Sequence, residues 1–271
     1  MSQGRLTFIG LGLYDEKDIS LKGLEEIKKC DKVYAEFYTA KLTGTDLKKI
    51  EKKIKKNIEV LSREETEKGD KILESTMKEN VVFLTCGDPM TATTHVDLRL
   101  RAIEKGIETK IIHGASIAAA VPGLLGLQNY KFGRTTTLAF PEKEYFPTSP
   151  YQIIKANKMM GLHTLVLLDI QADKERYMTA NEGIDLLLKM EKKLCESIFT
   201  EDSIVCVVGR AGSPNPTVMA NTIGFLKDKN FGPPLHTIVI PGNLHFMEVE
   251  ALVKLAGLPG ELKLSKKIQK L

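Results

Sequence analysis

Short apolar runs that alternate with longer amphipathic stretches are the feature that most limits how this chain can fold. Runs rich in β-branched and large aliphatic residues occupy positions 6–9, 32–35, 58–61, 81–84, 110–112, 136–140, 164–168, 204–208 and 237–240. Such runs are typical of strands that are buried on both faces, and helical periodicity marks the stretches between them. The sequence therefore predicts the α/β class, with helices on both faces of its sheets.

Two capping boxes show where helices should begin. In each, a hydroxyl residue precedes a glutamate by three positions, so that each side chain can accept a hydrogen bond from the other residue's backbone N–H. Ser62 and Glu65 predict a helix that continues to about residue 78, and Thr179 and Glu182 predict one that continues through residue 188. Both helices fall between predicted strands, as βαβ units require.

A segment of small residues and glycines at 114–133 separates two stretches of strand and helix alternation. The 271 residues allow one large domain or two modest ones, because a domain usually contains about 100 to 200 residues. We place a boundary between residues 115 and 130. The resulting prediction is an N-terminal α/β domain over 1–120 and a C-terminal α/β domain over 121–271.

Charge and composition exclude several classes of protein. The 39 Lys and Arg against 35 Asp and Glu give a net charge of +4, which does not indicate a nucleic-acid partner. The densest basic run, 48–56, carries aliphatic residues at helical spacing, so its lysines are expected on a solvated face. No apolar stretch reaches the ~18 residues of a membrane span. With no such span, we expect a cytoplasmic protein. The four cysteines lack zinc-ligand spacing, so we expect reduced, mostly buried thiols.

Turns that follow predicted strands are the places to search for a ligand site, since ligands of open α/β sheets bind beyond the carboxyl ends of strands. Three such turns stand out, at 10–13, 87–89 and 114–117. The first has two glycines, but Asp15 stands where a dinucleotide fingerprint needs glycine, which disfavours a nicotinamide domain. Close backbone packing is the alternative explanation for these glycines.

The turn Gly87-Asp88-Pro89 exposes a carboxylate between a flexible residue and a rigid one. Small hydroxyl residues follow it at the start of a predicted helix, through Thr91 to His95. Backbone and side-chain donors at such a helix start favour a polar ligand, although a plain turn explains the three residues equally well.

A serine hydrolase is a rival interpretation. Ser116 lies between a predicted strand and a predicted helix, and Asp169 and His236 follow in the order of an α/β-hydrolase triad. The last glycine of a nucleophile elbow is missing, and a serine that caps a helix is the commoner explanation. His245 and Glu248 have a metal-ligand spacing without companion ligands, so no metal site is predicted.

Several segments of the chain resemble the diphthine synthase family. They cover nearly its whole length and comprise residues 8–13, 34–39, 87–89 with 92–95, 161–165 with 169–170, 177–182, 210–213 and 241–245. Gly87-Asp88-Pro89 alone indicates only the wider superfamily of tetrapyrrole-methylase-like proteins. Residues 36–39 and 177–182 are far more specific to the diphthine branch.

The resemblance implies two α/β domains of the tetrapyrrole methylase type, each with a mostly parallel or mixed sheet flanked by helices, and a cofactor cleft between the domains. It implies an S-adenosylmethionine-dependent N-methyltransferase that releases S-adenosylhomocysteine and methylates the amino group of a 3-amino-3-carboxypropyl histidine on translation elongation factor 2, in diphthamide biosynthesis. It also implies a homodimer. By motif match, the cofactor contacts should be Leu13, Asp88, Thr91, Ser116, Ile117, Leu168, Ala211 and His236.

Residues at the end of the second predicted strand are candidates for the substrate side of the site. They are Glu36, Tyr38 and Thr39, with Thr94 and His95 as further candidates. A surface ion pair is the alternative for Glu36, and half-buried packing is the alternative for Tyr38. The sequence identifies no general base. Within the superfamily a tetrapyrrole, precorrin-like acceptor is the nearest competitor, and a nonenzymatic binding module is a third class.

Overall fold

The computed structural model describes residues 4–142 and 146–264 and separates into two compact units. The first unit extends to Ile117 and includes the segment Ile170–Arg176. The second contains Ala118–Asp169 and the chain from Tyr177 onward. The contiguous domains at 1–120 and 121–271 stay a prediction. They place residues 170–176 in the C-terminal domain, whereas the structure groups Ile170–Arg176 with the first unit.

The first unit is built on a five-stranded sheet with the order β3-β2-β4-β1-β5, in which every paired strand is parallel. The strands are β1 (Arg5–Gly10), β2 (Lys32–Glu36), β3 (Glu59–Val60), β4 (Val81–Thr85) and β5 (Glu108–Ile112). The helices are α1 (Leu21–Lys29), α2 (Leu47–Ile54), α3 (Arg63–Lys68), α4 (Asp70–Thr76) and α5 (His95–Glu104). Because the strands are parallel, the loops that follow them emerge at one edge of the sheet.

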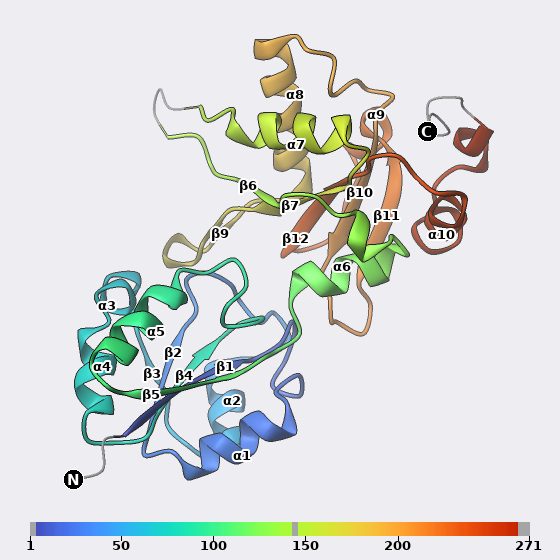
Figure 1. Ribbon diagram of the computed structural model, residues 1–271. Coiled ribbons are helices and arrows are strands. Elements are labelled where there is room, and N and C mark those ends of the chain that lie inside the picture. The colour runs from blue at the N-terminus through green and yellow to red at the C-terminus, as the bar shows by residue number, and fades with distance from the viewer. Residues whose placement is uncertain (1–3, 143–145, 265–271) are drawn as a thin grey trace. The chain divides into compact units, whose positions relative to one another are not determined.

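Helices cover both faces of this sheet, as the near-continuous apolar strands require (Figure 1). On one face Ile27 of α1 and Ile50 of α2 pack with Val82 in one buried cluster. On the other face Leu98 of α5 packs with Phe83 in a second cluster. These helices therefore bury an apolar stripe against the sheet, and most of their charged residues are turned outward, with Glu26 of α1 as a buried exception.

The second unit has a mixed five-stranded sheet with the order β11-β10-β12-β7-β6. Only β6 and β7 pair in parallel, and the other three pairings are antiparallel. The strands are β6 (Thr136–Leu138), β7 (Thr164–Leu168), β10 (Ile204–Gly209), β11 (Thr217–Thr222) and β12 (His236–Ile240). The helices are α6 (Ile117–Leu125), α7 (Ser149–Met159), α8 (Ala180–Leu194), α9 (Ile223–Leu226) and α10 (Phe246–Ala256).

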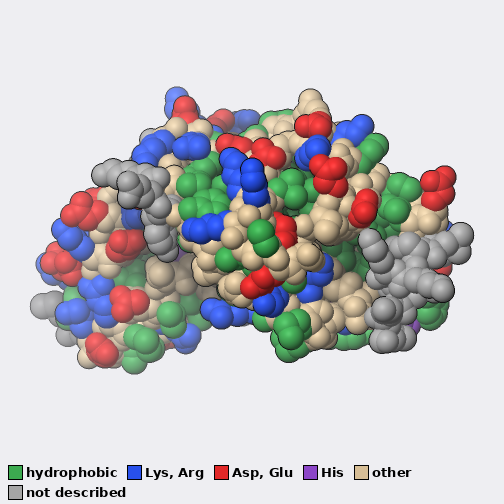
Figure 2. Space-filling view, turned by 90° about the horizontal axis from the view of Figure 1, so that it is seen from above, with side chains coloured by type: hydrophobic (Ala, Val, Ile, Leu, Met, Phe, Trp, Pro, Cys, Tyr) green, Lys and Arg blue, Asp and Glu red, His purple; other side chains and the backbone are tan. Residues whose placement is uncertain are grey.

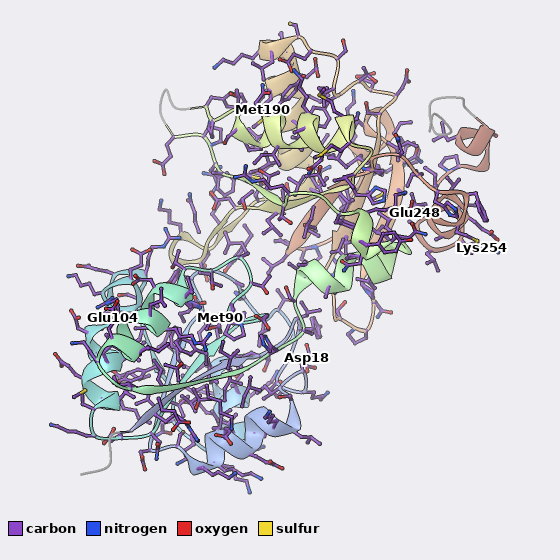
Figure 3. All side chains as sticks on the ribbon, viewed as in Figure 1. Asp18, Met90, Glu104, Met190, Glu248 and Lys254 are labelled. Carbon is purple, nitrogen blue, oxygen red and sulfur yellow. The ribbon has the colours of Figure 1, made fainter. Side chains whose placement is uncertain are left out.

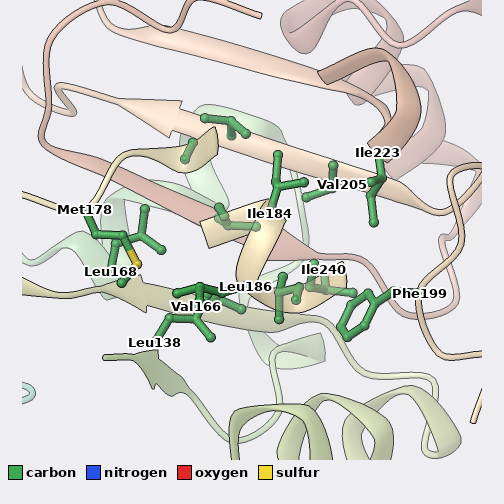
Figure 4. Packing of buried hydrophobic residues seen from close by; sticks show 14 of the residues in the cluster. Leu138, Val166, Leu168, Met178, Ile184, Leu186, Phe199, Val205, Ile223 and Ile240 are labelled. Carbon is green, nitrogen blue, oxygen red and sulfur yellow. The ribbon is translucent and has the colours of Figure 1, made fainter. Parts of the chain in front are cut away.

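Shorter elements complete the chain. Strands β8 (Ile170–Gln171) and β9 (Arg176–Tyr177) form a two-stranded ribbon. Within the described residues there are three 3₁₀ helices, η1 (Asn129–Lys131), η2 (Ala172–Lys174) and η3 (Gly260–Leu264). In the second unit, Val166 of β7, Ile184 of α8 and Val205 of β10 meet in a buried core (Figure 4).

The predicted α/β class and all nine predicted strands are confirmed. Both capping boxes are confirmed, with Ser62 and Glu65 bonded reciprocally at α3 and Thr179 and Glu182 at α8. The single helix predicted from 63 to about 78 is wrong, because Gly69 adopts a φ of +68° and divides it into α3 and α4. Strand β11 and the β8–β9 ribbon were not predicted.

A buried carboxylate on α10 joins four parts of the second unit (Figure 3). Glu248 is fully buried, and its Oε1 accepts hydrogen bonds from the Gln128 N–H at 2.9 Å and from His163 Nε2 at 3.0 Å. Its Oε2 accepts from the His245 N–H at 2.8 Å and pairs with the Lys131 ammonium. Burial raises the pKa of Glu248, but the hydrogen bonds lower it more strongly. The resulting pKa is about 2.

Candidate functional site

Three loops of the first unit meet at the carboxyl edge of its sheet through backbone contact. A Cβ atom built on Gly10 would lie 2.4 Å from the Gly87 carbonyl oxygen, and one on Gly114 would lie 2.3 Å from the same oxygen. These residues end or follow β1, β4 and β5. Contacts below 3 Å leave no room for a side chain, so glycine is required at both positions. The close packing that was the alternative explanation for Gly10 is therefore present.

The loop after β1 is fixed by its own aspartate. Gly12 has a φ of +80° and exchanges backbone hydrogen bonds with Gly87 at 3.2 and 2.7 Å. The Asp18 carboxylate accepts from the N–H groups of Leu13 and Tyr14 at 3.1 and 2.7 Å. Leu13 is half-buried, so this arrangement holds part of its aliphatic side chain at the edge of the sheet.

Asp88 carries a fixed negative charge in the loop after β4. It is 7% exposed, its Oδ1 accepts from the Met90 N–H at 2.9 Å, and its Oδ2 lies 2.7 Å from His113 Nδ1. Burial raises the pKa of the Asp88 carboxyl, but hydrogen bonds from Met90, His113 and Thr91 outweigh it and leave the pKa below its ordinary value. Asp88 is therefore ionised at neutral pH.

The remaining cofactor candidates of the first unit lie on the same loops. Thr91 is exposed, and its hydroxyl donates to Asp88 Oδ1 at 3.3 Å. Ser116 and Ile117 are half-buried where the loop after β5 enters α6. The structure thus brings Leu13, Asp88, Thr91, Ser116 and Ile117 to one edge of the first sheet, as the parallel strands predicted.

The substrate candidates that follow β2 form a tight turn around a carboxylate. Glu36 is fully buried, and its Oε2 accepts from the N–H groups of Tyr38 and Thr39 at 3.2 and 3.1 Å. Its Oε1 accepts from the Thr39 hydroxyl at 2.5 Å. Burial, with the Glu36 charge nearby, raises the pKa of Tyr38 to about 12, so its phenol keeps its proton at neutral pH. The Arg63 guanidinium lies over the Tyr38 ring.

Thr94 and His95 differ in exposure although they are adjacent. Thr94 is exposed at the start of α5, whereas His95 is 2% exposed and packs edge-on against Phe83. His95 Nδ1 lies 3.0 Å from the Pro89 carbonyl oxygen, which can only accept, so Nδ1 carries the proton. Burial lowers the pKa of His95, and the ring is neutral at pH 7.

In the second unit the other three cofactor candidates lie together at one sheet edge. Leu168 ends β7, Ala211 follows β10, and His236 begins β12, where it is the register partner of Gly209. His236 Nδ1 accepts from the Ala180 N–H at 3.2 Å, so the proton of the neutral ring is on Nε2. Among the described residues Nε2 makes no hydrogen bond of ordinary geometry, although the backbone carbonyl groups of Pro233, Gly232 and Phe231 lie close enough to the ring to raise its pKa. Burial and the Arg210 charge lower the pKa of His236.

Three polar residues near the candidates were missed by the sequence analysis. His113 contacts Asp88, and Arg210 anchors the chain beside Ala211 by donating to the carbonyl oxygens of Phe231 and Pro233 at 2.9 and 2.8 Å. The Ser213 hydroxyl is buried, with no partner in the described part of the chain. Arg210 and Ser213 belong to a segment that carried the family resemblance, which was the available signal.

The contacts of the second unit do not support the hydrolase interpretation. In a catalytic triad the histidine Nδ1–H donates to the carboxylate, but His236 Nδ1 accepts from Ala180 instead. Asp169 Oδ2 accepts from the Phe140 N–H at 2.9 Å. His245 and Glu248, the pair with metal-ligand spacing, form the capping box of α10. No group of three or more potential metal ligands occurs among residues 4–142 and 146–264.

Comparisons with known proteins agree on one family. A family model described as tetrapyrrole (corrin/porphyrin) methylases matches residues 5–227. A diphthine synthase of Methanococcus maripaludis is 54% identical over 248 residues, which cover 91% of this chain and 97% of the relative. A diphthine synthase of Methanosphaera stadtmanae is 50% identical over 257 residues, covering 95% and 98% respectively.

Solved structures give the same result. A crystal structure of diphthine synthase has a TM-score of 0.88 at 39% identity and covers 96% of this chain and 99% of its own. A putative diphthine synthase from Entamoeba histolytica has a TM-score of 0.86 at 39% identity, covering 93% and 98%. The similarity therefore includes both compact units.

Proposed function

The chain belongs to the diphthine synthases of the tetrapyrrole (corrin/porphyrin) methylase family, and we propose that it methylates the amino group of a 3-amino-3-carboxypropyl histidine on translation elongation factor 2. It is an S-adenosylmethionine-dependent methyltransferase. The relatives' name supports the diphthamide precursor over a tetrapyrrole as acceptor. The site described above supports a donor that carries positive charge.

The buried Asp88 carboxylate is the observation that carries this assignment. Hydrogen bonds from Met90, Thr91 and His113 fix its position, and it keeps its charge at neutral pH. S-adenosylmethionine carries a sulfonium and an amino group, and an ionised carboxylate complements either one. In the first unit we assign donor contacts to Leu13, Asp88, Thr91, Ser116 and Ile117.

Polar atoms of the second unit also fit S-adenosylmethionine, because they can donate hydrogen bonds to it. His236 Nε2–H and the Ser213 hydroxyl are buried, and neither makes a hydrogen bond of ordinary geometry within the described residues, although backbone carbonyl groups lie near the His236 ring. Buried donors without partners are unfavourable, so a ligand that accepts from them would be stabilised. In this unit we assign contacts with S-adenosylmethionine to Leu168, Ala211 and His236. The reaction product, S-adenosylhomocysteine, would use the same contacts.

The residues have only modest proton chemistry to perform. When bound, the donor supplies a methyl group on a sulfonium, which an unprotonated amine attacks in line. An α-amino group has a pKa near 8, so presenting it neutral at pH 7 costs only about 1.4 kcal/mol. Orientation of the two reactants can contribute about 7 to 11 kcal/mol. The protein's main contribution is therefore alignment, and no general base is assigned.

We place the acceptor beside Tyr38, Thr39 and Thr94, whose side chains are half-buried or exposed at the carboxyl edge. The protonated Tyr38 phenol can donate a hydrogen bond to the carboxylate of the acceptor. Glu36 and His95 were also candidates for the substrate side, but both are buried, so we propose that they act through the loops they hold, Glu36 through the Tyr38–Thr39 turn and His95 through the loop that carries Asp88.

The decisive experiment incubates the protein with methyl-labelled S-adenosylmethionine and elongation factor 2 from a strain that lacks this activity. Label in the modified histidine supports the proposal, and absence of label contradicts it. Label in a porphyrin precursor would support a tetrapyrrole acceptor. Donor binding without transfer to any acceptor would indicate a binding module, and reaction of Ser116 with a fluorophosphonate would indicate a hydrolase.

Location and assembly are further parts of the proposal. We propose a cytoplasmic homodimer whose protein partner is elongation factor 2, with no direct nucleic-acid contact. No helix in the described ranges is both long enough and apolar enough to cross a membrane. Basic and acidic side chains are interspersed on the face shown in Figure 2, which gives no single-sign field of the kind that attracts nucleic acid.

A further inference from the structure

Two ionisable side chains lie buried beneath the loops at the carboxyl edge of the first sheet. Glu36 ends β2 and is 0% exposed, and His95 begins α5 and is 2% exposed. The carboxylate Oε1 lies 3.9 Å from His95 Nε2. Burial of such groups is unfavourable unless their hydrogen bonds are satisfied, so the bonds that they make indicate what the pair does.

Glu36 holds the turn that carries two of the substrate candidates. Its carboxylate accepts the N–H of Tyr38, the N–H of Thr39 and the Thr39 hydroxyl. These three donors lie within three residues of Glu36. One buried side chain therefore accepts two backbone N–H groups and a hydroxyl of this turn, and its carboxylate takes the place that a neighbouring strand would have as hydrogen-bond acceptor.

His95 holds the other loop. Its Nδ1–H donates to the Pro89 carbonyl oxygen at 3.0 Å, and the ring is fixed edge-on against Phe83. Pro89 follows Asp88 directly, so this bond restrains the backbone that carries the charged carboxylate. With the proton on Nδ1, His95 Nε2 has no partner within residues 4–142 and 146–264 and faces Glu36.

We propose that Glu36 and His95 are positioning residues for methyl transfer, in which Glu36 sets the acceptor-side turn at Tyr38 and Thr39 and His95 sets the Asp88–Pro89 turn. The proposal rests on the proposed function, since it assigns one loop to the acceptor and the other to the donor. Because the two side chains lie next to each other, the two loops are held from a common buried point. Neither residue contacts the reacting atoms.

Two amide substitutions at His95 separate loss of the bond to Pro89 from loss of the ring. Both remove the imidazole, and they differ in which ring nitrogen the amide can replace. The side-chain amide of Asn can replace Nδ1–H, whereas that of Gln reaches the position of Nε2 instead. His95→Asn should therefore keep the Pro89 bond, and His95→Gln should lose it. We expect His95→Gln to weaken donor binding about three- to tenfold by calorimetry, the effect of one lost hydrogen bond. His95→Asn should stay within about twofold of wild type.

Glu36→Gln tests the other loop. It keeps one acceptor oxygen and loses the other, so the Tyr38–Thr39 turn should loosen. We expect KM for elongation factor 2 to rise about three- to tenfold while donor affinity stays within about twofold. Thr85→Val is the matched control. Thr85 is the fully buried register partner of Glu36, and its hydroxyl has no partner among the described residues, so this change removes no bond to either loop.

Measurements on the protein without donor keep the test independent of activity. Amide exchange should accelerate at Met90 in His95→Gln and at Thr39 in Glu36→Gln, but at neither in His95→Asn or Thr85→Val. Nitrogen-15 shifts of His95 in the wild type should show a protonated Nδ1 and an unprotonated Nε2. The reverse tautomer overturns the proposal even if a variant fails to fold.

The role of His95 and the role of Glu36 can each be overturned separately. Equal donor affinities and equal exchange rates in His95→Asn and His95→Gln would overturn the role of His95. A Glu36→Gln protein with unchanged KM and unchanged Thr39 exchange would overturn the role of Glu36. If the wild type binds no donor, the proposed function fails, while the exchange rates and the tautomer still decide whether the two loops are held in this way.

Discussion

The carboxylate of Asp88, in the loop after β4, combines burial with ionisation. Burial alone would raise its pKa, but three donors hold the pKa below the ordinary 3.8. The charge is therefore present at neutral pH and is lost only as the pH falls below this value. Donor binding that depends on Asp88 should persist down to about pH 5.

Replacement of Asp88 by Asn should test that charge directly, because the amide keeps the size of the side chain. We expect donor affinity to fall about ten- to hundredfold, the range for loss of a hydrogen bond to a charged group. Isothermal calorimetry at pH 7 measures it. Glu104→Gln, an exposed carboxylate on α5, is the control and should bind as wild type does. Unchanged affinity in Asp88→Asn would remove Asp88 from the site.

Gly10 and Gly114 are required because the three loops touch through their backbones. A methyl group at either position would lie 2.4 or 2.3 Å from the Gly87 carbonyl oxygen. We expect Gly10→Ala to lower the free energy of unfolding by more than about 2 kcal/mol, as overpacking against backbone does. Gly123→Ala is the control, since nothing lies within 4 Å of a Cβ there and alanine favours a helix. Equal stabilities in urea would contradict the predicted crowding.

Among the elements, α10 shows how one buried carboxylate can fix several pieces of chain. Glu248 receives hydrogen bonds from the chain before η1, from the residue before β7 and from the N-cap of its own helix. His163, which donates to it, accepts from the Gly242 N–H at 3.0 Å through its other nitrogen. Two of the segments that carried the family resemblance, 161–165 and 241–245, are therefore structural in this contact.

Glu248→Gln should destabilise the protein in a pH-dependent way. A carboxyl pKa lowered from 4.5 to about 2 corresponds to about 3 kcal/mol at pH 7, and this stability is lost as the pH falls from 4.5 toward 2. The difference between wild type and variant should therefore shrink by about 1.4 kcal/mol between pH 7 and pH 3.5. Urea unfolding at both pH values measures it. Glu250, which forms a surface ion pair with Lys254 on the same helix, provides the control. Glu250→Gln should change stability by less than about 0.5 kcal/mol. A pH-independent difference for Glu248→Gln would contradict the lowered pKa.

Elements with local signals could be predicted from the sequence, and elements defined by distant contacts could not. The strands marked by short apolar runs and the two capping boxes depend on neighbours in the chain. Strand β11 contains Asn221 and borders the sheet through β10 alone, so its sequence lacks an apolar run. His245 and Glu248 have the three-residue spacing of a capping box as well as a metal spacing, but histidine is not a hydroxyl residue, so only the structure shows that the pair caps α10.

The same distinction applies to the candidate site. Parallel strands place their following loops together, which brought Leu13, Asp88 and Ser116 to one edge as expected. Burial of Glu36, of His95 and of His236 Nε2 depends on register across strands and on helices far away in sequence. No local pattern reports these features, so the division between residues that contact ligand and residues that hold loops required the structure.

For the molecule as a whole, each unit has its own buried core, and exposed apolar side chains bear on assembly. Phe246 and Met247 in the first turn of α10 are 69% and 53% exposed, and Tyr130 of η1 is 78% exposed. The Glu248 hydrogen bonds hold η1 and α10 in place. Exposed apolar side chains such as these are suited to a subunit contact, for which about 800 Å² per partner is typical.

The homodimer proposal can be tested at this surface by sedimentation equilibrium. Wild type should have twice the chain mass of 30.1 kDa, and the double substitution of Phe246 and Met247 by Glu should shift it to monomer, because two charges would be buried in an apolar contact. Met159 and Met160 are 79% and 64% exposed at the end of α7, so their double replacement by Glu is the matched control. A monomeric wild type would contradict the homodimer itself. A dimer that only the control disrupts would instead place the contact at α7.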